Sequence, residues 1–339
     1  MVTRSREWTD LAARVVSGGE EARRRWLGTL AVALASVSFG VQGVLAKYAY
    51  AGGASVPTVL ATRFLFATLI LWAIPVFRPS IRRTHLRLPR GRALGAAILG
   101  AIFVTNSLFY FLALDLLPAS TAVMLVFVFP ALVALWARIF LGERLSRPQL
   151  AALGLALLGC VLTVDPRAAL VLGAGVSWLG VLWALGSAFS NSWYVLLAAV
   201  FGRGLAPLTL ALYSVPLTML GFCAYLVFDG GPSPNITPWG WTSAVSLGIL
   251  TGLAIYAYLI GVGLIGPSRA AVVATAEPVT TVVLGVLLLS EALTPPKIVG
   301  AACIVAAITL LNRARERADT EPRPADDTVP EDGVLERSP

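Results

Sequence analysis

The chain has 339 residues, of which 57% are hydrophobic and only 13% are charged, against about 25% charged residues in a soluble domain. Its net charge of +8 comes from arginines in short loops and tails, which indicates membrane topology rather than nucleic-acid binding. The three cysteines all lie within apolar runs and the single histidine, His85, lies in a basic loop, which argues against a disulfide framework and a metal site. We expect no cofactor.

Long apolar segments follow one another along the chain, and ten of them are long enough to cross a bilayer, which takes about 20 residues per helix. In chain order they are 27–47, 57–77, 93–114, 121–141, 148–164, 174–201, 207–228, 241–264, 270–290 and 296–312. The first segment follows three arginines, as a signal peptide would, but its apolar run is longer than the roughly 7–15 residues of a signal core. We therefore predict an uncleaved helix.

The basic residues predict the orientation in the membrane. With both termini in the cytoplasm, all lysines and arginines fall inside except Lys47, Arg63, Arg167 and Lys297. This asymmetry is the positive-inside pattern, and it requires an even number of spans. We therefore predict an N-in, C-in multi-pass protein.

The two halves of the chain repeat each other. Pro130 and Glu143 recur 148 residues later as Pro278 and Glu291, and each glutamate is followed by a leucine and a proline. Each half holds five spans, so the second copy must enter the membrane from the opposite side. The prediction is an all-α integral membrane protein with ten transmembrane helices in two inverted five-helix repeats, and with a site near the bilayer midplane.

Four regions follow from this pattern. They are a basic cytoplasmic N-terminal segment at 1–26, the two repeats at 27–164 and 174–312, and a cytoplasmic tail at 313–339. The first is compatible with a helix on the inner leaflet. The tail is rich in proline and acidic residues, so we expect it to be disordered.

The repeated stretches ASTAVMLVFVFPALVALWARIFLGERLS and PSRAAVVATAEPVTTVVLGVLLLSEALT resemble the EamA type of the drug/metabolite transporter superfamily. Phe39-Gly40, Lys47 and Arg63 are similar to features of the family's first two helices. The resemblance covers residues 27–312 and implies a transporter in the inner membrane of a bacterium. It does not define the substrate, because the family includes amino-acid and metabolite exporters, importers and efflux proteins for toxic compounds.

Ionisable side chains inside a span are costly, so they are candidates for function. Glu277 precedes Pro278, where the ninth helix should bend, and is predicted to bind protons or a substrate amine; a permanent partner such as Arg63 is the alternative. Arg63 suits a substrate carboxylate or snorkels to the outer head groups. Lys47 steers substrate or anchors the first helix. Phe129 occupies the repeat position of Glu277, so the halves differ chemically.

Polar and aromatic residues within the spans are candidates to line a cavity. They are Gln42, Asn106, Tyr110, Asn191, Trp193, Tyr213 and Tyr258. Singly, such aromatics are more often packing or interface residues, but together they favour an amphipathic, aromatic or amine-bearing substrate. Pro130, Glu143, Pro278 and Glu291 are interpreted as structural, with each glutamate fixing the turn between two spans.

These features predict a secondary transporter that exports a small metabolite, such as an amino acid, an amine or a drug-like compound, by alternating access. Protons are the candidate coupling ion, and the partners are the substrate and the lipid bilayer. A metabolite importer or a lipid-type flippase is the alternative. The sequence has no Gly-rich nucleotide-binding loop and no cluster of Asp, His or Glu at one membrane face, which argues against ATP use and against an enzyme.

Overall fold

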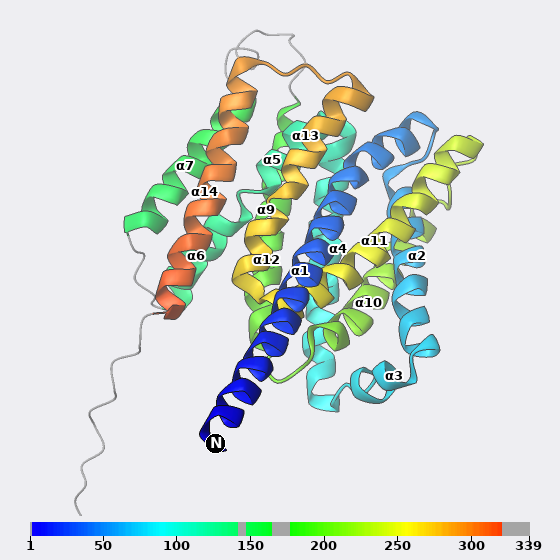
Figure 1. Ribbon diagram of the computed structural model, residues 1–339. Helices are drawn as coiled ribbons and strands as arrows, with labels where there is room; N and C mark the ends of the chain where they lie inside the picture. Colours follow the sequence, from blue (N-terminus) through cyan, green and yellow to red (C-terminus); the bar gives the residue numbers. More distant parts are fainter. Residues whose placement is uncertain (1, 142–146, 165–176, 321–339) are drawn as a thin grey trace, which may run out of the picture.

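The computed structural model describes residues 2–141, 147–164 and 177–320, and within these ranges it is helical with short connections (Figure 1). The first repeat holds α1 (Val2–Ala51), α2 (Val56–Phe77), α3 (Pro79–His85), a short 3₁₀ turn (Arg90–Arg92), α4 (Ala93–Leu116), α5 (Ala119–Val126), α6 (Phe129–Leu141) and α7 (Arg147–Val164). The second repeat holds α9 (Trp178–Phe201), α10 (Pro207–Phe228), α11 (Pro238–Ile265), α12 (Pro267–Ala274), α13 (Ala276–Leu289) and α14 (Pro295–Thr320).

The helices provide the predicted spans. Among the described residues, eight helical segments are long and apolar enough to cross a membrane, with α5 and α6 forming one of them and α12 and α13 another. The apolar parts of α7 and α14 are shorter, and these two helices pack on each other as the fifth and tenth spans. The prediction of an all-α membrane protein built from two inverted five-helix repeats is confirmed.

The two ends of the chain differ in detail from the predicted regions. α1 continues without a break from Val2 into the first span, and its 50 residues exceed what a bilayer core of about 30 Å requires. The basic N-terminal segment therefore prolongs the first helix. At the other end α14 continues to Thr320, so the first eight residues of the predicted tail (313–320) are helical, and residues 321–339 lie outside the described part.

Packing between the helices crosses from one repeat to the other. α1 packs along α11, and α4 packs along α9. α1 and α9 are the first helices of the two repeats, and α4 and α11 are the third helices. In both pairs, therefore, the first helix of one repeat packs on the third helix of the other. α2 packs on α10 and α7 on α14, each against its own counterpart. This arrangement is the one expected from a pseudo-two-fold axis in the membrane plane.

The fourth span of each repeat is interrupted near its middle. α5 ends at a two-residue turn that begins with Phe127, and Thr275 separates α12 from α13. These positions are 148 residues apart, which is the offset of the repeat. The sequence predicts continuous spans at 121–141 and 270–290, with a bend at the second; the structure instead has two half-helices in each.

The prolines explain the interruption. Pro130 and Pro278 have no backbone N–H, so the carbonyls of Val126 and Ala274, four residues earlier, have no helical donor. Broken helices at membrane depth are tolerated where they face protein or a cavity rather than lipid. The two breaks therefore mark where a cavity is expected.

Candidate functional site

A cavity of about 620 Å³ lies at the level of the two breaks. Its lining includes Val126 and Phe127 from the first break and Ala274 from the second, together with residues of α1, α2, α4, α9, α10 and α11. The volume falls within the roughly 300–1,000 Å³ that is typical of small-molecule sites. Both repeats thus contribute walls to one chamber.

One end of the cavity reaches the surface. Ala199, Arg203 and Pro207, at the turn between α9 and α10, line it and are exposed. At the opposite end the bundle is tightly packed, and the hydroxyl of Tyr50 donates to the carbonyl of Phe111 at 3.1 Å. The cavity is therefore open toward the α9–α10 turn and closed toward the other side.

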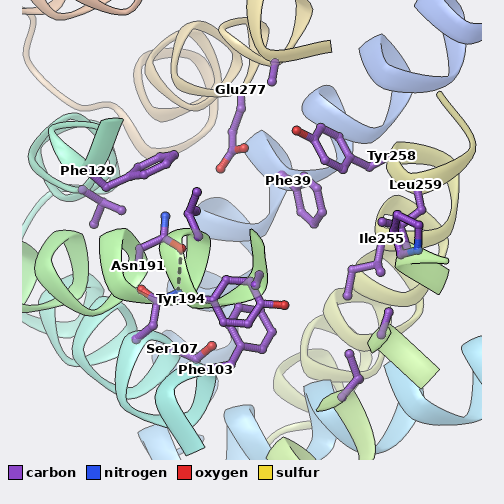
Figure 2. A pocket seen from close by; sticks show the side chains of 18 of the residues that line it. Phe39, Phe103, Ser107, Phe129, Asn191, Tyr194, Ile255, Tyr258, Leu259 and Glu277 are labelled. Atoms are coloured by element: carbon purple, nitrogen blue, oxygen red, sulfur yellow. Dashed lines mark hydrogen bonds between the residues drawn. The ribbon is translucent and has the colours of Figure 1, made fainter. Parts of the chain in front are cut away.

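The structure brings seven of the ten sequence-predicted site residues to this cavity. They are Gln42, Arg63, Asn106, Tyr110, Asn191, Tyr258 and Glu277. Figure 2 shows Glu277 across from Asn191, with Tyr258 on the neighbouring wall. These residues come from six helices, so only the tertiary structure can assemble them.

Arg63 is held in place by neighbours from two other helices. Its side chain is only 7% exposed. Its Nε donates to Thr251 Oγ1 at 3.0 Å, and its Nη2 donates to Gln42 Oε1 at 2.8 Å. The rings of Phe64 and Phe111 lie 5.0 and 4.9 Å from the guanidinium carbon, in cation–π contact. The guanidinium is buried in protein and does not extend to the head groups.

The packing of α2 explains why Arg63 points where it does. The next residue, Phe64, is fully buried, stacks on Phe222 at 5.2 Å and meets Phe103 edge-on at 5.6 Å. These contacts hold Phe64 in the hydrophobic core and fix the rotation of α2. Arg63 consequently faces α1 and α11.

Glu277 owes its position to the second break. Because α13 begins at Ala276, Glu277 lies in the first turn of a helix, where an acidic side chain is favoured by the helix dipole. Gly40 lets α1 approach this turn closely, since a Cβ at that position would lie 2.9 Å from the Glu277 carbonyl oxygen. The carboxylate extends into the cavity (Figure 2).

An amide pair joins the repeats on the opposite wall. Asn106 Nδ2 on α4 lies 3.5 Å from Asn191 Oδ1 on α9, and Ser187 Oγ donates to Asn106 Oδ1 at 2.7 Å. These groups give the cavity uncharged donors and acceptors near its charged residues.

Three predicted site residues lie elsewhere. Trp193 stacks on Trp136 at 5.7 Å, and the hydroxyl of Tyr213 donates to the carbonyl of Leu86 at 2.6 Å. Lys47 lies about 7.5 Å further along α1 than Gln42, by the helical rise, and does not line the cavity. The first two therefore serve packing between elements.

Glu291 contacts the other repeat. Its Oε1 accepts from the backbone N–H of Ala119 at 2.5 Å, and its Oε2 accepts from the N–H of Ser120 at 3.1 Å and from the Ser120 hydroxyl. The carboxylate thereby caps the first turn of α5 in the other repeat. The sequence analysis predicted a role for Glu291 only in the turn between two spans of its own repeat. Glu143, its repeat counterpart, lies outside the described residues.

Several aromatic residues line the cavity that the sequence analysis did not predict as site residues. Phe103 and Tyr194 line it as a stacked pair at 5.1 Å, and Phe39, Phe127 and Phe129 also face it. Signals existed for Phe129, which occupies the repeat position of Glu277, and for Phe39, which resembles an aromatic residue of the family's first helix. An aromatic side chain in an apolar helix otherwise carries no mark of the face on which it lies.

Comparison with known proteins agrees with this architecture. The family model described as the EamA-like transporter family matches residues 26–165 and 178–313, one match for each repeat. The chain belongs to the EamA-like transporter family. The members of this family are transporters, and the described part of the chain has several helices long enough to cross a membrane. This EamA-like chain is therefore a multi-pass membrane transporter.

Relatives of this EamA-like chain carry transporter names. It is 28% identical to the uncharacterized inner membrane transporter YicL of Salmonella typhimurium, covering 86% of this chain and 98% of that protein. It is 26% identical to an uncharacterized transporter of Synechocystis, covering 84% and 93% of the two chains. A crystal structure of another protein matches with a TM-score of 0.60 at 23% identity, over 87% of this chain and 99% of that one, which shows the shared fold.

Proposed function

We propose that this chain is a secondary transporter that exports a small metabolite across the cytoplasmic membrane by alternating access. The observation that carries the proposal is the chamber at the level of the broken helices, which both repeats line and which reaches the surface beside the α9–α10 turn. An amino acid, an amine or a drug-like compound matches its mixture of aromatic, amide and charged lining residues. The name of the relative YicL supports the inner membrane.

The distribution of basic residues supports the orientation. The start of α1, α3 and the C-terminal end of α14 lie at the same end of the molecule, at the bottom of Figure 1. Arg78, Arg92 and Arg203 follow or precede helices at that end, so it is the cytoplasmic one by the positive-inside rule. The open end of the cavity then faces the cytoplasm, where an exporter takes up its substrate.

Glu291 supports an alternating mechanism. Its bonds to Ala119 and Ser120 tie the second repeat to the first at the closed, outer end. In inverted-repeat transporters the two halves exchange conformations, so that one side opens as the other closes. Releasing this cap while the inner end closes would expose the chamber to the outside.

Glu277 is our candidate for proton coupling. It is the one acidic residue among those that line the cavity. A carboxylate there can hold either a proton or a cationic group, so proton uptake on one side can favour release of substrate. The position of Glu277 beside the break between α12 and α13 would connect this event to helix movement.

A growth assay tests the proposal. A bacterial host would express the native protein or its Glu277→Gln form and be exposed to toxic amino-acid analogues, amines and cationic dyes. We expect the native protein to protect against one class, and Glu277→Gln to lose most of this protection. Asp115→Asn, a matched change at an exposed carboxylate outside the cavity, should protect as the native protein does.

The other outcomes separate the parts of the proposal. If the native protein reaches the membrane but does not protect the host, export is contradicted. An importer or a lipid flippase would then be the favoured function. Equal protection by both forms would contradict the coupling role of Glu277 and leave export standing.

A further inference from the structure

We infer that the cavity binds a zwitterionic substrate with an apolar body, holding its carboxylate at Arg63 and Gln42 and its ammonium group at Glu277. The inference rests on the proposed function and adds the charge pattern of the substrate. The basic side chain of Arg63 and the acidic side chain of Glu277 both line the chamber. In the described part of the chain the one ion pair joins Arg25 and Glu21, so Arg63 and Glu277 do not neutralise each other directly.

Arg63 is prepared for an anion. A guanidinium has five N–H groups, and hydrogen bonds to Thr251 and Gln42 use two of them. These bonds and the flanking rings of Phe64 and Phe111 fix the plane of the group before any ligand arrives. A planar carboxylate can take two of the remaining N–H groups side by side. Arg63 therefore binds an anion with little further ordering.

Gln42 adds a second donor to the same place. Because Arg63 can only donate, it requires the oxygen of the Gln42 amide on its side, and this fixes the orientation of the amide. The Nε2 group of Gln42 is left without an acceptor among the described residues, although the side chain is only 3% exposed. A buried donor is unfavourable in this state, and a ligand carboxylate oxygen would satisfy it.

Glu277 provides the opposite pole. Its carboxylate extends into the chamber (Figure 2), while its backbone carbonyl accepts a hydrogen bond from the Thr281 hydroxyl at 3.2 Å. A ligand ammonium would meet an acceptor there. A substrate with only a positive charge would also face Arg63, and one with only a negative charge would face Glu277. A molecule that carries both charges matches both poles.

The remaining wall selects the body of the substrate. Phe103, Phe127, Phe129, Tyr194 and Tyr258 line the cavity. Such a wall favours an aromatic or large aliphatic group, which buries apolar surface and can pack on ring faces. The inferred class is therefore an α-amino acid, or a similar zwitterion, with a bulky apolar side chain.

Three probes with the same ring test the charge pattern. Binding of L-phenylalanine, phenethylamine and 3-phenylpropanoate would be measured on the purified full-length protein. We expect L-phenylalanine to bind at least about 10-fold more tightly than either singly charged compound, because each of these leaves one pole unpaired. Arg63→Gln should remove the preference over phenethylamine. Glu277→Gln should remove the preference over 3-phenylpropanoate.

A second variant distinguishes this pattern from general damage. Gln42→Leu should weaken binding of the two carboxylates and leave binding of phenethylamine unchanged, a split that partial unfolding cannot produce. Arg138→Gln and Asp115→Asn, at exposed positions away from the cavity, should bind all three compounds as the native protein does.

The inference is overturned if native protein binds phenethylamine as tightly as L-phenylalanine, if the variants leave the preferences unchanged, or if none of the three probes binds. The growth assay separates this failure from failure of the proposed function. Protection against amines or dyes without zwitterion binding would overturn the charge pattern and leave export intact, whereas protection against no compound class would contradict export itself.

Discussion

At the scale of the residue, Arg63 illustrates what the sequence predicts and what it leaves open. An arginine within a span is costly in lipid, which is why the sequence singles it out. Its hydrogen-bond partner Thr251, however, lies 188 residues away. A partner so remote is brought near only by the packing of α2 on α11, and no local pattern indicates it.

The contact between Arg63 and Thr251 leads to a stability prediction. Thr251→Val keeps the side-chain shape but removes the oxygen that accepts from Nε, at a cost of about 1.5–3 kcal/mol for a hydrogen bond to a charged group. The midpoint of thermal unfolding in detergent should therefore fall. Thr242→Val is the control, because this exposed threonine on the same helix bonds only to its own helix. Equal midpoints for the two variants would contradict the role of Thr251.

Trp193 and Tyr213 show the limit of prediction at this scale. Both are aromatic residues in apolar helices, yet they pack against other elements while Phe103 and Tyr194 line the cavity. A helix in a membrane bundle is apolar on its lipid-facing and its protein-facing sides alike, so its sequence has no polar stripe that reveals the inner face. Charged residues escape this ambiguity because lipid excludes them.

At the scale of the element, the broken fourth spans depend on residues that the sequence does show. Pro130 and Pro278 recur at the repeat offset, and the second predicts a bend. A proline alone, however, does not decide between a kink and a full break. Neighbouring helices and cavities decide it, because they determine whether the freed carbonyls can be tolerated.

The cap that Glu291 places on α5 predicts a change in outer-side access. Glu291→Gln removes the charged acceptor of the Ala119 and Ser120 N–H groups, which should weaken the closure by about 1.5–3 kcal/mol. In a protein without its native cysteines, Ser107→Cys in the cavity should then react faster with a membrane-impermeant thiol reagent added outside. Unchanged labelling, as expected for Asp115→Asn, would contradict a closing role for Glu291.

The packing of α7 on α14 predicts a difference between two glycines. A Cβ on Gly300 would lie 2.7 Å from the carbonyl oxygen of Gly159, so the two helices approach closely at this pair. Gly300→Leu should therefore destabilise the protein by about 1–3 kcal/mol through overpacking. Gly154→Leu, on α7 with open space around it, should leave the unfolding midpoint near that of the native protein. Similar effects for both would contradict this close contact.

At the scale of the whole molecule, the sequence predicts the architecture well. The span count, the repeat offset and the odd number of spans per repeat together define an inverted duplication. The packing of α1 on α11, of α4 on α9, of α2 on α10 and of α7 on α14 agrees with it. The open end of the cavity was beyond prediction. An alternating-access protein adopts two conformations that differ in free energy by only a few kcal/mol. Both have the same sequence and the same spans, so hydropathy does not indicate which end of the cavity is open.

The central claim is that a small metabolite crosses the membrane through the cavity between the repeats. It is tested most directly by uptake into inside-out membrane vesicles, using the compound that the growth assay identifies. Native protein should accumulate this compound. Ala274→Trp, which fills the cavity at the second break, should lose most uptake, whereas Ala101→Trp on the exposed face of α4 should retain it. Native rates in the Ala274→Trp variant would contradict the claim.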